Sequence, residues 1–225
     1  MSVAARLAEV HARIERAAYE AGRVPGDVKL IAVSKTKPAE AIREAYASGQ
    51  RAFGENYAQE LATKAEALAD LRDLQWHFIG HLQTNKAKIV ARFAHVVHAI
   101  DSAALVRELG KRAARDRSSP LEVLIEVNVG REPQKAGATP SEIDEVMAAV
   151  RAQPSLALRG LMTMPPAGDP VATRKTFETL LLLRNLHGGA ATLPELSMGM
   201  SEDLELAVAC GASYVRVGRA IFGER

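Results

Sequence analysis

The stretch Leu-Ile-Ala-Val-Ser-Lys-Thr-Lys-Pro at positions 30–38 shows the unit from which the fold is built. Residues 30–33 form a short apolar run with two β-branched side chains, which is typical of a buried strand. Polar residues follow, and Pro38 suits the first turn of a helix because its fixed φ fits there and its missing N–H is not needed. We therefore predict a strand, a polar strand end and a helix to about residue 48, where Gly49 follows.

The same unit recurs along the rest of the chain. Apolar runs with polar or glycine ends predict seven further strands, at 51–53, 75–79, 95–100, 121–129, 157–162, 195–198 and 213–217. Helices are expected over 57–70 and over 170–187. A further helix should start at about residue 83, and three others should end at about residues 115, 152 and 210. Alternating strands and helices imply right-handed crossovers and a parallel sheet. Eight such units predict an α/β fold, a closed (β/α)8 TIM barrel, with an open doubly wound sheet as the alternative.

An amphipathic helix precedes the first strand. Apolar residues recur at spacings of three and four from Val3 to Ile14, and Gly22 ends the pattern. We expect a helix over residues 2–22 that packs on the barrel close to its last helix. The chain shows no linker long enough to divide domains, so residues 1–225 are predicted to form a single domain.

Composition limits the classes of function. The 29 basic and 27 acidic residues give a net charge of +2, which leaves no surplus to drive binding to nucleic acid or to an anionic membrane. Cys210 is the single cysteine, so an internal disulfide is excluded. The first 22 residues lack the apolar core of a signal peptide and the apolar runs are strand-length, so we expect a cytoplasmic protein without a membrane segment. The histidines match no metal-binding motif, and no metal is expected.

Lys35 is the first candidate for a reactive residue, because the functional residues of such barrels lie where the strands end. Strict alternation places it on the inward face of the strand with Ile31 and Val33. A lysine amine partly withdrawn from water at the barrel mouth is a nucleophile suited to an aldehyde. A solvated lysine on the rim is the simpler interpretation, and it applies equally to Lys37.

The last two strands end in similar glycine-containing turns. Glycines and helix starts present backbone N–H groups to anions, and the loops after strands seven and eight of such barrels often hold a phosphate. The Ser201 hydroxyl and the backbone at Gly218 are candidates for that role. The alternative is that Ser201 only caps a helix, which Glu202 and Asp203 favour because they already complement the helix dipole.

Arg216 alternates with Val215 and Val217 in the last predicted strand. If the valines face the helices, the guanidinium points into the barrel, where a buried charge is costly unless it is paired. Its acceptor is either a carboxylate of the core or a ligand atom such as a ring nitrogen. The residues alone leave both interpretations open.

Six motifs in this order resemble the pyridoxal phosphate homeostasis protein family, over residues 28–225. They are AVSKTKP at 32–38, FGENY at 53–57, WHFIGHLQTNK at 76–86, GLMTM at 160–164, SMGMS at 197–201 and RVGRAIFG at 216–223. That family looks like a stand-alone version of the barrel domain of alanine racemase and eukaryotic ornithine decarboxylase. The resemblance implies a barrel of the fold type III kind that binds pyridoxal 5′-phosphate (PLP).

The resemblance also implies the residues of the site. The family's cofactor lysine falls on Lys35, which implies an internal aldimine there, and the arginine that meets the pyridine nitrogen falls on Arg216. The loop at 130–137 matches a family loop, but no role follows for its Lys135 or for Lys37. The remaining implied contacts are Met200, Ser201, Gly218 and Arg219 for the phosphate and Asn56 for the cofactor ring.

The resemblance points to a carrier of PLP and away from an efficient enzyme. Arg216 cannot give up its proton, so it would donate to the ring nitrogen and leave the ring a poorer electron sink. Racemases take a second base from a C-terminal β-domain and a partner subunit, whereas this sequence ends eight residues after Val217. We expect no catalytic residue, a monomer, and a role in intracellular PLP homeostasis and delivery to apo-enzymes. A weak PLP-dependent amino-acid racemase or decarboxylase, and a barrel for another phosphorylated ligand, are the alternatives.

Overall fold

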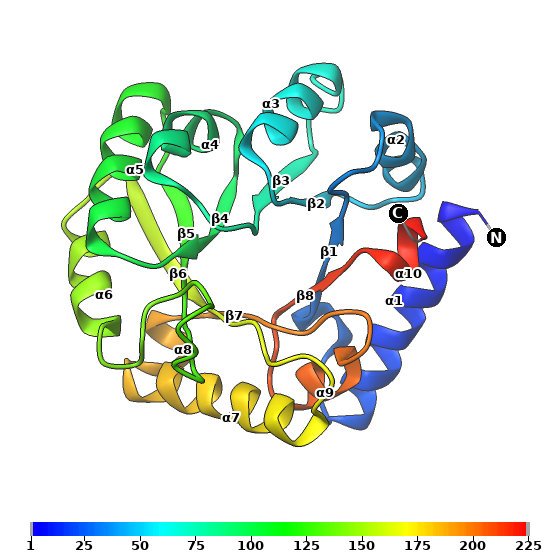
Figure 1. Cartoon of the computed structure of the whole chain (residues 1–225). Coiled ribbons are helices and arrows are strands. Elements are labelled where there is room, and N and C mark those ends of the chain that lie inside the picture. Colours follow the sequence, from blue (N-terminus) through cyan, green and yellow to red (C-terminus); the bar gives the residue numbers. More distant parts are fainter. Residues whose placement is uncertain (1, 224–225) are drawn as a thin grey trace.

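The computed structural model of the chain, described for residues 2–223, contains a closed barrel of eight parallel strands. The strands pair in chain order and β8 pairs with β1, which closes the ring (Figure 1). The predicted (β/α)8 barrel is confirmed, and the open sheet is excluded. The strands are β1 (Lys29–Val33), β2 (Ala52–Glu55), β3 (Gln75–Phe78), β4 (Val96–Ile100), β5 (Leu121–Glu126), β6 (Leu156–Met162), β7 (Glu195–Ser197) and β8 (Tyr214–Val217).

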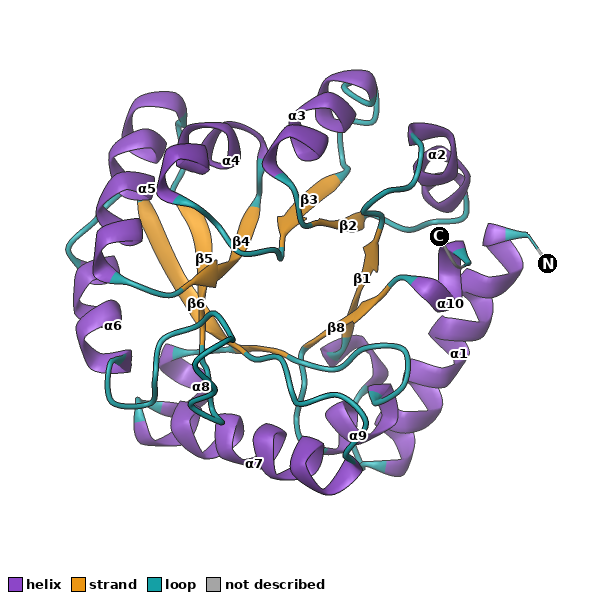
Figure 2. Cartoon of the chain, viewed as in Figure 1, coloured by secondary structure: helices purple, strands orange, loops and turns teal. Residues whose placement is uncertain are grey.

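Helices surround the strands as an outer layer (Figure 2). Ser102 begins one of them by accepting from the Leu105 amide, and Asp169 caps another before Pro170. No helix within residues 2–223 is long and apolar enough to cross a membrane. The helices are α1 (Val3–Glu20), α2 (Ala39–Ala47), α3 (Ala58–Ala67), α4 (Ala87–Phe93), α5 (Ala103–Asp116), α6 (Ile143–Arg151), α7 (Pro170–Leu186), α8 (Gly189–Thr192), α9 (Leu204–Ala209) and α10 (Arg219–Phe222).

Several boundaries differ from those predicted. The fifth strand ends at Glu126, three residues before the predicted end; beyond it, Val127 donates to the Met162 carbonyl and forms an isolated bridge with Ala138. The helix predicted from about residue 83 starts with a 3₁₀ turn, Thr84–Lys86, a common form of helix entry. The short helix α8 was not predicted, because four residues are too few to show helical periodicity.

The two faces of each strand have different neighbours. On β8, Val215 and Val217 pack in the large core between the strands and the helices, whereas Tyr214 belongs to a smaller cluster inside the barrel. Arg216 therefore points into the barrel, as the alternation predicted. Ile31 of β1 lies in the same inner cluster, which confirms that the inward face of β1 leads toward Lys35.

Helix α1 packs against α9 and α10 and covers the seam where the barrel closes (Figure 1). Its residues at the predicted spacing, Val3, Leu7, Val10 and Ile14, are buried. Arg13 adds polar contacts: its Nε lies 2.8 Å from Glu205 Oε1, and its Nη2 donates to the Ser201 carbonyl at 3.0 Å. The first helix thus holds the loop that follows β7.

Candidate cofactor-binding site

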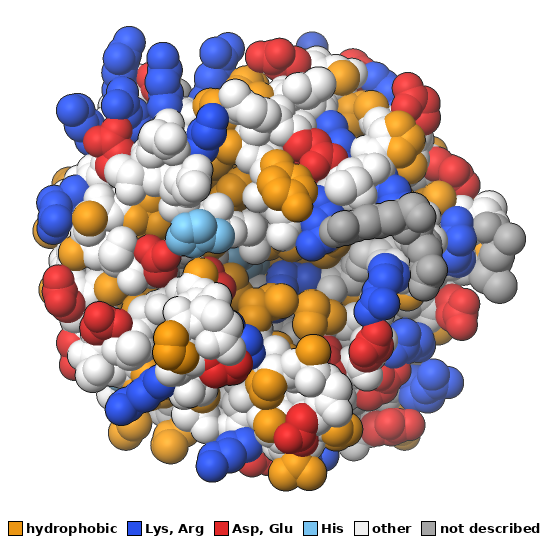
Figure 3. All heavy atoms as spheres, in the orientation of Figure 1, with side chains coloured by type: hydrophobic (Ala, Val, Ile, Leu, Met, Phe, Trp, Pro, Cys, Tyr) orange, Lys and Arg blue, Asp and Glu red, His pale blue; other side chains and the backbone are white. Residues whose placement is uncertain are grey.

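The residues implied as cofactor contacts lie on four consecutive strands of the barrel. In the order of the ring these strands are β7, β8, β1 and β2. Figure 3 shows the molecule hollowed over the centre of the ring, with basic and hydrophobic side chains at the floor. The closure of the barrel therefore brings residues near the start and near the end of the chain to the same half of the rim. The implied contacts there are Met200 and Ser201 after β7, Arg216, Gly218 and Arg219 on and after β8, Lys35 after β1, and Asn56 after β2.

Lys35 lies in a tight turn directly after β1. The Lys37 amide donates to the Ser34 carbonyl at 3.0 Å, which closes the turn, and Thr36 has a φ of 63°. This left-handed conformation is uncommon for a residue other than glycine. Lys35 itself is half-buried. A backbone held in such a conformation needs contacts from outside the turn to keep it there.

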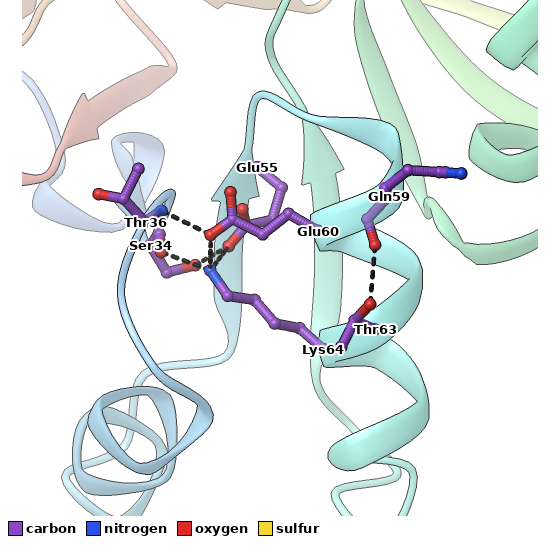
Figure 4. Close-up of polar contacts among 7 residues, drawn as sticks. All are labelled: Ser34, Thr36, Glu55, Gln59, Glu60, Thr63 and Lys64. Atoms are coloured by element: carbon purple, nitrogen blue, oxygen red, sulfur yellow. Dashed lines mark hydrogen bonds and ion pairs between the residues drawn. The ribbon is translucent and has the colours of Figure 1, made fainter.

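Those contacts come from Lys64 of α3, which is almost fully buried (Figure 4). Its Nζ donates to the Ser34 carbonyl at 2.6 Å, to Glu55 Oε1 at 2.7 Å and to Glu60 Oε1 at 2.7 Å. The three protons of the ammonium therefore each have an acceptor. We call Lys64 with Ser34, Glu55 and Glu60 the Lys64 cluster.

The Lys64 cluster fixes the peptide groups on both sides of Lys35. On one side the Ser34 hydroxyl donates to Glu55 Oε1 at 2.6 Å, and on the other the Thr36 amide donates to Glu60 Oε1 at 2.5 Å. Burial raises the pKa of Glu55, while its hydrogen bonds with Lys64 and Ser34 act in the opposite direction. Sequence reasoning missed this cluster, because a lysine on a helix is usually solvated.

Arg216 is only 4% exposed and meets neutral acceptors. Its Nη1 donates to Ser197 Oγ at 2.7 Å, and its Nη2 lies 3.0 Å from the Thr163 carbonyl and 3.1 Å from Met164 Sδ. Burial lowers the pKa of Arg216 to about 10, so the guanidinium stays charged at neutral pH. Within residues 2–223 it forms no ion pair, so a core carboxylate does not take the role of direct acceptor.

Glu126, at the end of β5, faces the same part of the interior. Burial raises its pKa to about 7, while the nearby charge of Arg216 lowers it. The sequence shows Glu126 only as a charge that interrupts an apolar run, with no sign of its perturbed titration.

His77 and His98, for which the sequence offered no role, lie inside the barrel. His77 Nδ1 is 2.9 Å from His98 Nε2, and His98 Nδ1 is 2.9 Å from Ser197 Oγ. No group of three or more potential metal-ligating side chains occurs in the described part of the chain.

Asn56 follows β2 and carries an unsatisfied acceptor. Its Oδ1 is buried and has no hydrogen-bond partner within the described residues. Gly80, after β3, permits this position, because a Cβ there would lie 2.2 Å from the Asn56 carbonyl oxygen. A buried acceptor without a donor, at the mouth of a barrel, fits a site that a ligand completes.

The two glycine-containing turns differ in what they offer an anion. A Cβ at Gly218 would lie 3.1 Å from the Val33 carbonyl, so glycine lets the end of β8 lie close to β1. After β7, the Asp203 carboxylate accepts from the Met200 amide, and no hydrogen bond of the Ser201 hydroxyl occurs within residues 2–223. Asp203 is the N-cap residue of α9, but within the described residues neither its carboxylate nor the Ser201 hydroxyl accepts from an amide of that helix.

The other three basic residues named from the sequence follow β8, β1 and β5. Arg219 is exposed and pairs with Glu202. Lys37 lines a groove between α2 and α3. Lys135 lies in the loop after β5, where its Nζ is 2.6 Å from Glu132 Oε1.

Comparison with known proteins first gives the class of barrel. The family model described as "Alanine racemase, N-terminal domain" matches residues 6–225. The alanine racemase of Corynebacterium glutamicum shares the fold with a TM-score of 0.67 at 21% identity, over 98% of this chain and 61% of that chain. The protein is thus a barrel of the alanine racemase N-terminal type.

Closer relatives give the family. The pyridoxal phosphate homeostasis protein of Pseudomonas aeruginosa is 46% identical over 226 residues, covering 100% of this chain and 96% of the relative. The structure of PipY from Synechococcus elongatus, solved with PLP bound, is 38% identical with a TM-score of 0.83, over 99% of this chain and 100% of that chain. The chain belongs to the pyridoxal phosphate homeostasis protein family, as the six motifs predicted.

Proposed function

We propose that the protein binds PLP at the mouth of the barrel and serves in PLP homeostasis. The observation that carries the proposal is that Arg216 lies on β8 and Lys35 follows β1, the strand paired with β8. Ile31 and Arg216 are paired in the register of β1 and β8, and Lys35 lies four residues further toward the mouth. An amine that follows one strand and a buried guanidinium on the strand paired with it suit an aldehyde on a ring whose nitrogen accepts a hydrogen bond. The PLP bound in the structure of PipY supports the same ligand.

Each part of the ligand has residues that fit it. Lys35 supplies the amine that forms a C=N bond with the cofactor aldehyde and releases water. Arg216 donates to the ring nitrogen, and the buried Oδ1 of Asn56 lies at the same rim. The phosphate is assigned to Ser201 with its neighbour Met200, and to the backbone of Gly218 and Arg219. PLP, when bound, supplies an electron-withdrawing ring.

The charge state of Arg216 favours a holder of the cofactor over a racemase or a decarboxylase. Its pKa of about 10 keeps the guanidinium protonated at neutral pH, so it donates to the ring nitrogen and leaves that nitrogen without a proton. An unprotonated ring withdraws electrons less strongly, which disfavours carbanion chemistry. An assay of α-proton exchange on a panel of amino acids separates the two functions, since turnover well above that of free PLP contradicts the holder.

Delivery follows from the reversible bond at Lys35. We propose that apo-enzymes in the cytoplasm receive the cofactor when their own lysine amine takes the place of Lys35, and that the protein acts as a monomer. Transfer to a purified apo-enzyme, followed by recovery of its activity, tests delivery. Size-exclusion chromatography with light scattering tests the monomer, which a stable dimer contradicts.

The absorbance spectrum tests the site itself. The wild type incubated with PLP should show a band near the visible edge from the C=N linkage, and Lys35→Ala should lack it. Lys88→Ala, which removes an exposed lysine of α4, is the matched control and should keep the band. A wild type without the band, or a band that persists unchanged in Lys35→Ala, contradicts the proposal.

A further inference from the structure

Four polar side chains follow one another through the interior of the barrel. They come from β8, β7, β4 and β3, and consecutive members are 2.7, 2.9 and 2.9 Å apart. None is more than 4% exposed. We call them the axial chain, which consists of Arg216, Ser197, His98 and His77.

Arg216 decides which way the hydrogen bonds of the axial chain run. A guanidinium can only donate, so the Ser197 oxygen must accept from it. The Ser197 hydrogen then needs an acceptor of its own, and His98 Nδ1 is the other partner of this hydroxyl within residues 2–223. Ser197 is fully buried, where a hydroxyl hydrogen without an acceptor is costly. Ser197 therefore donates to His98 Nδ1.

The tautomers of both histidines follow from that step. His98 accepts at Nδ1, so its hydrogen is on Nε2, and it donates to His77 Nδ1. His77 accepts at Nδ1 in turn and carries its hydrogen on Nε2. Both rings must be neutral, because a second hydrogen would place two donors against each other. Burial acts in the same direction, since it lowers the pKa of His77 to about 3 and that of His98 well below its ordinary value.

The axial chain ends at His77. Its Nε2 is buried and has no hydrogen-bond partner within the described residues, so no second group there imposes the opposite direction. The Tyr214 ring packs against His77 and His98, with centroids 5.4 and 5.5 Å away. His77 also lines a cavity of about 610 Å³, to which Lys29 and Glu195, the first residues of their strands, contribute.

We propose that His98 and His77 are positioning residues of the cofactor site, which fix the Ser197 hydroxyl as an acceptor for Arg216. The role in PLP binding rests on the proposed function, whereas the hydrogen-bond geometry of the axial chain does not. A lone serine hydroxyl can rotate and offer Arg216 its hydrogen instead of a lone pair. Bound to His98 Nδ1, it keeps a lone pair toward the guanidinium, and the neutral ring adds no positive charge beside Arg216.

Nitrogen-15 NMR of the wild-type histidine rings tests the geometry directly. At pH 7, without added PLP, both His77 and His98 should show an unprotonated Nδ1 and a protonated Nε2. Histidine-to-glutamine variants at 77 and 98 assign the signals, with the exposed His11 as an internal reference. A charged ring, or a hydrogen on Nδ1 of either residue, overturns the proposal whether or not PLP binds.

Two substitutions of His98 test its role in PLP binding. Asparagine places its amide oxygen near the position of Nδ1 and keeps an acceptor for Ser197, whereas glutamine reaches the position of Nε2 and leaves Ser197 without one. We expect His98→Gln to weaken PLP binding by about three- to tenfold, the usual value of one hydrogen bond, and His98→Asn to rescue most of that loss. His11→Gln should bind PLP as the wild type does.

The shift of the PLP absorbance band adds a readout that a general loss of packing does not move. A displaced Arg216 changes the hydrogen bond to the ring nitrogen, so the band should shift in His98→Gln and return in His98→Asn. Equal affinities and equal bands in the two variants overturn the positioning role. If no variant, including the wild type, forms the band, the proposed function fails while the NMR result still decides the axial chain.

Discussion

At the scale of single residues, the barrel interior holds opposite charges that do not touch. Arg216 has neutral acceptors at hydrogen-bond distance, and Glu126 influences it only through the electric field. Burial disfavours the charged form of both groups, since it lowers the pKa of Arg216 to about 10 and raises that of Glu126 to about 7. Arg216 stays charged near neutral pH, whereas Glu126 titrates there.

The titration of Glu126 predicts a pH dependence of stability. Its pKa rises from an ordinary 4.5 to about 7 on folding, so the folded state holds the proton more tightly. The stabilisation is present below about pH 4.5 and is lost as the pH rises to about 7, by at most about 3.5 kcal/mol at about 1.4 kcal/mol per unit. Glu126→Gln should remove this dependence.

Urea unfolding of the wild type and of Glu126→Gln between pH 4 and 8 measures the effect. The free energy of unfolding of Glu126→Gln should rise relative to that of the wild type as the pH increases from 4 to 8. The two values should be most similar at the acid end. A constant difference at every pH would show that Glu126 titrates normally in the folded protein.

At the scale of elements, the site depends on a contact between α3 and the turn after β1. Lys64 joins the turn to Glu55 of β2 and to Glu60 of its own helix (Figure 4). The α3 helix thus does more than cover the sheet. It holds the backbone from which Lys35 projects, in a turn where Thr36 has a positive φ.

Replacement of Lys64 by methionine should be strongly destabilising. The change leaves the buried Glu55 carboxylate without its cation, and breaking a buried pair in this way costs about 3–5 kcal/mol. Glu55→Gln in the same chain should recover part of the loss, because no charge is then left unpaired. Chemical unfolding of the single and double variants measures both effects.

Lys111→Met provides the control, since Lys111 is an exposed lysine on α5. Its substitution should change the free energy of unfolding by no more than about 0.5 kcal/mol. If Lys64→Met costs as little as Lys111→Met, the Lys64 cluster does not hold the turn.

At the scale of the whole molecule, the barrel closes by pairing its first strand with its last. The seam between β1 and β8 joins residues about 185 positions apart in sequence, and α1 covers it from outside. The closed ring has no free edge. Loss of the seam leaves the edges of β1 and β8 unpaired, from which the neighbouring strands can separate one after another. We therefore expect the molecule to unfold as one cooperative unit.

A change at the seam should destabilise strands of the ring that do not contact it. Val215→Ala removes fully buried methyl groups from β8 and should cost about 2 kcal/mol. Trp76 of β3, the single tryptophan, reports on a strand separated from β8 by β1 and β2. Its fluorescence and the far-ultraviolet circular dichroism should shift to the same lower urea midpoint. Two separate transitions would show that the barrel opens in parts.

The sequence by itself determined the order of the strands, their alternation with helices and the polar residues that follow β1, β2, β7 and β8. Those features depend on local patterns: the alternation that turns Arg216 inward and the motif that carries Lys35 are both readable within a few residues. The same patterns placed Asn56, Ser201 and Gly218 at strand ends before any contact was known.

Only the tertiary structure decided which side chains meet across the barrel. Ser197 bonds His98, 99 positions away, and Lys64 bonds Ser34, 30 positions away. Such pairs depend on strand register and on how the ring closes, neither of which leaves a periodic trace in one sequence. For the same reason the sequence indicated no role for His98 or for Lys64.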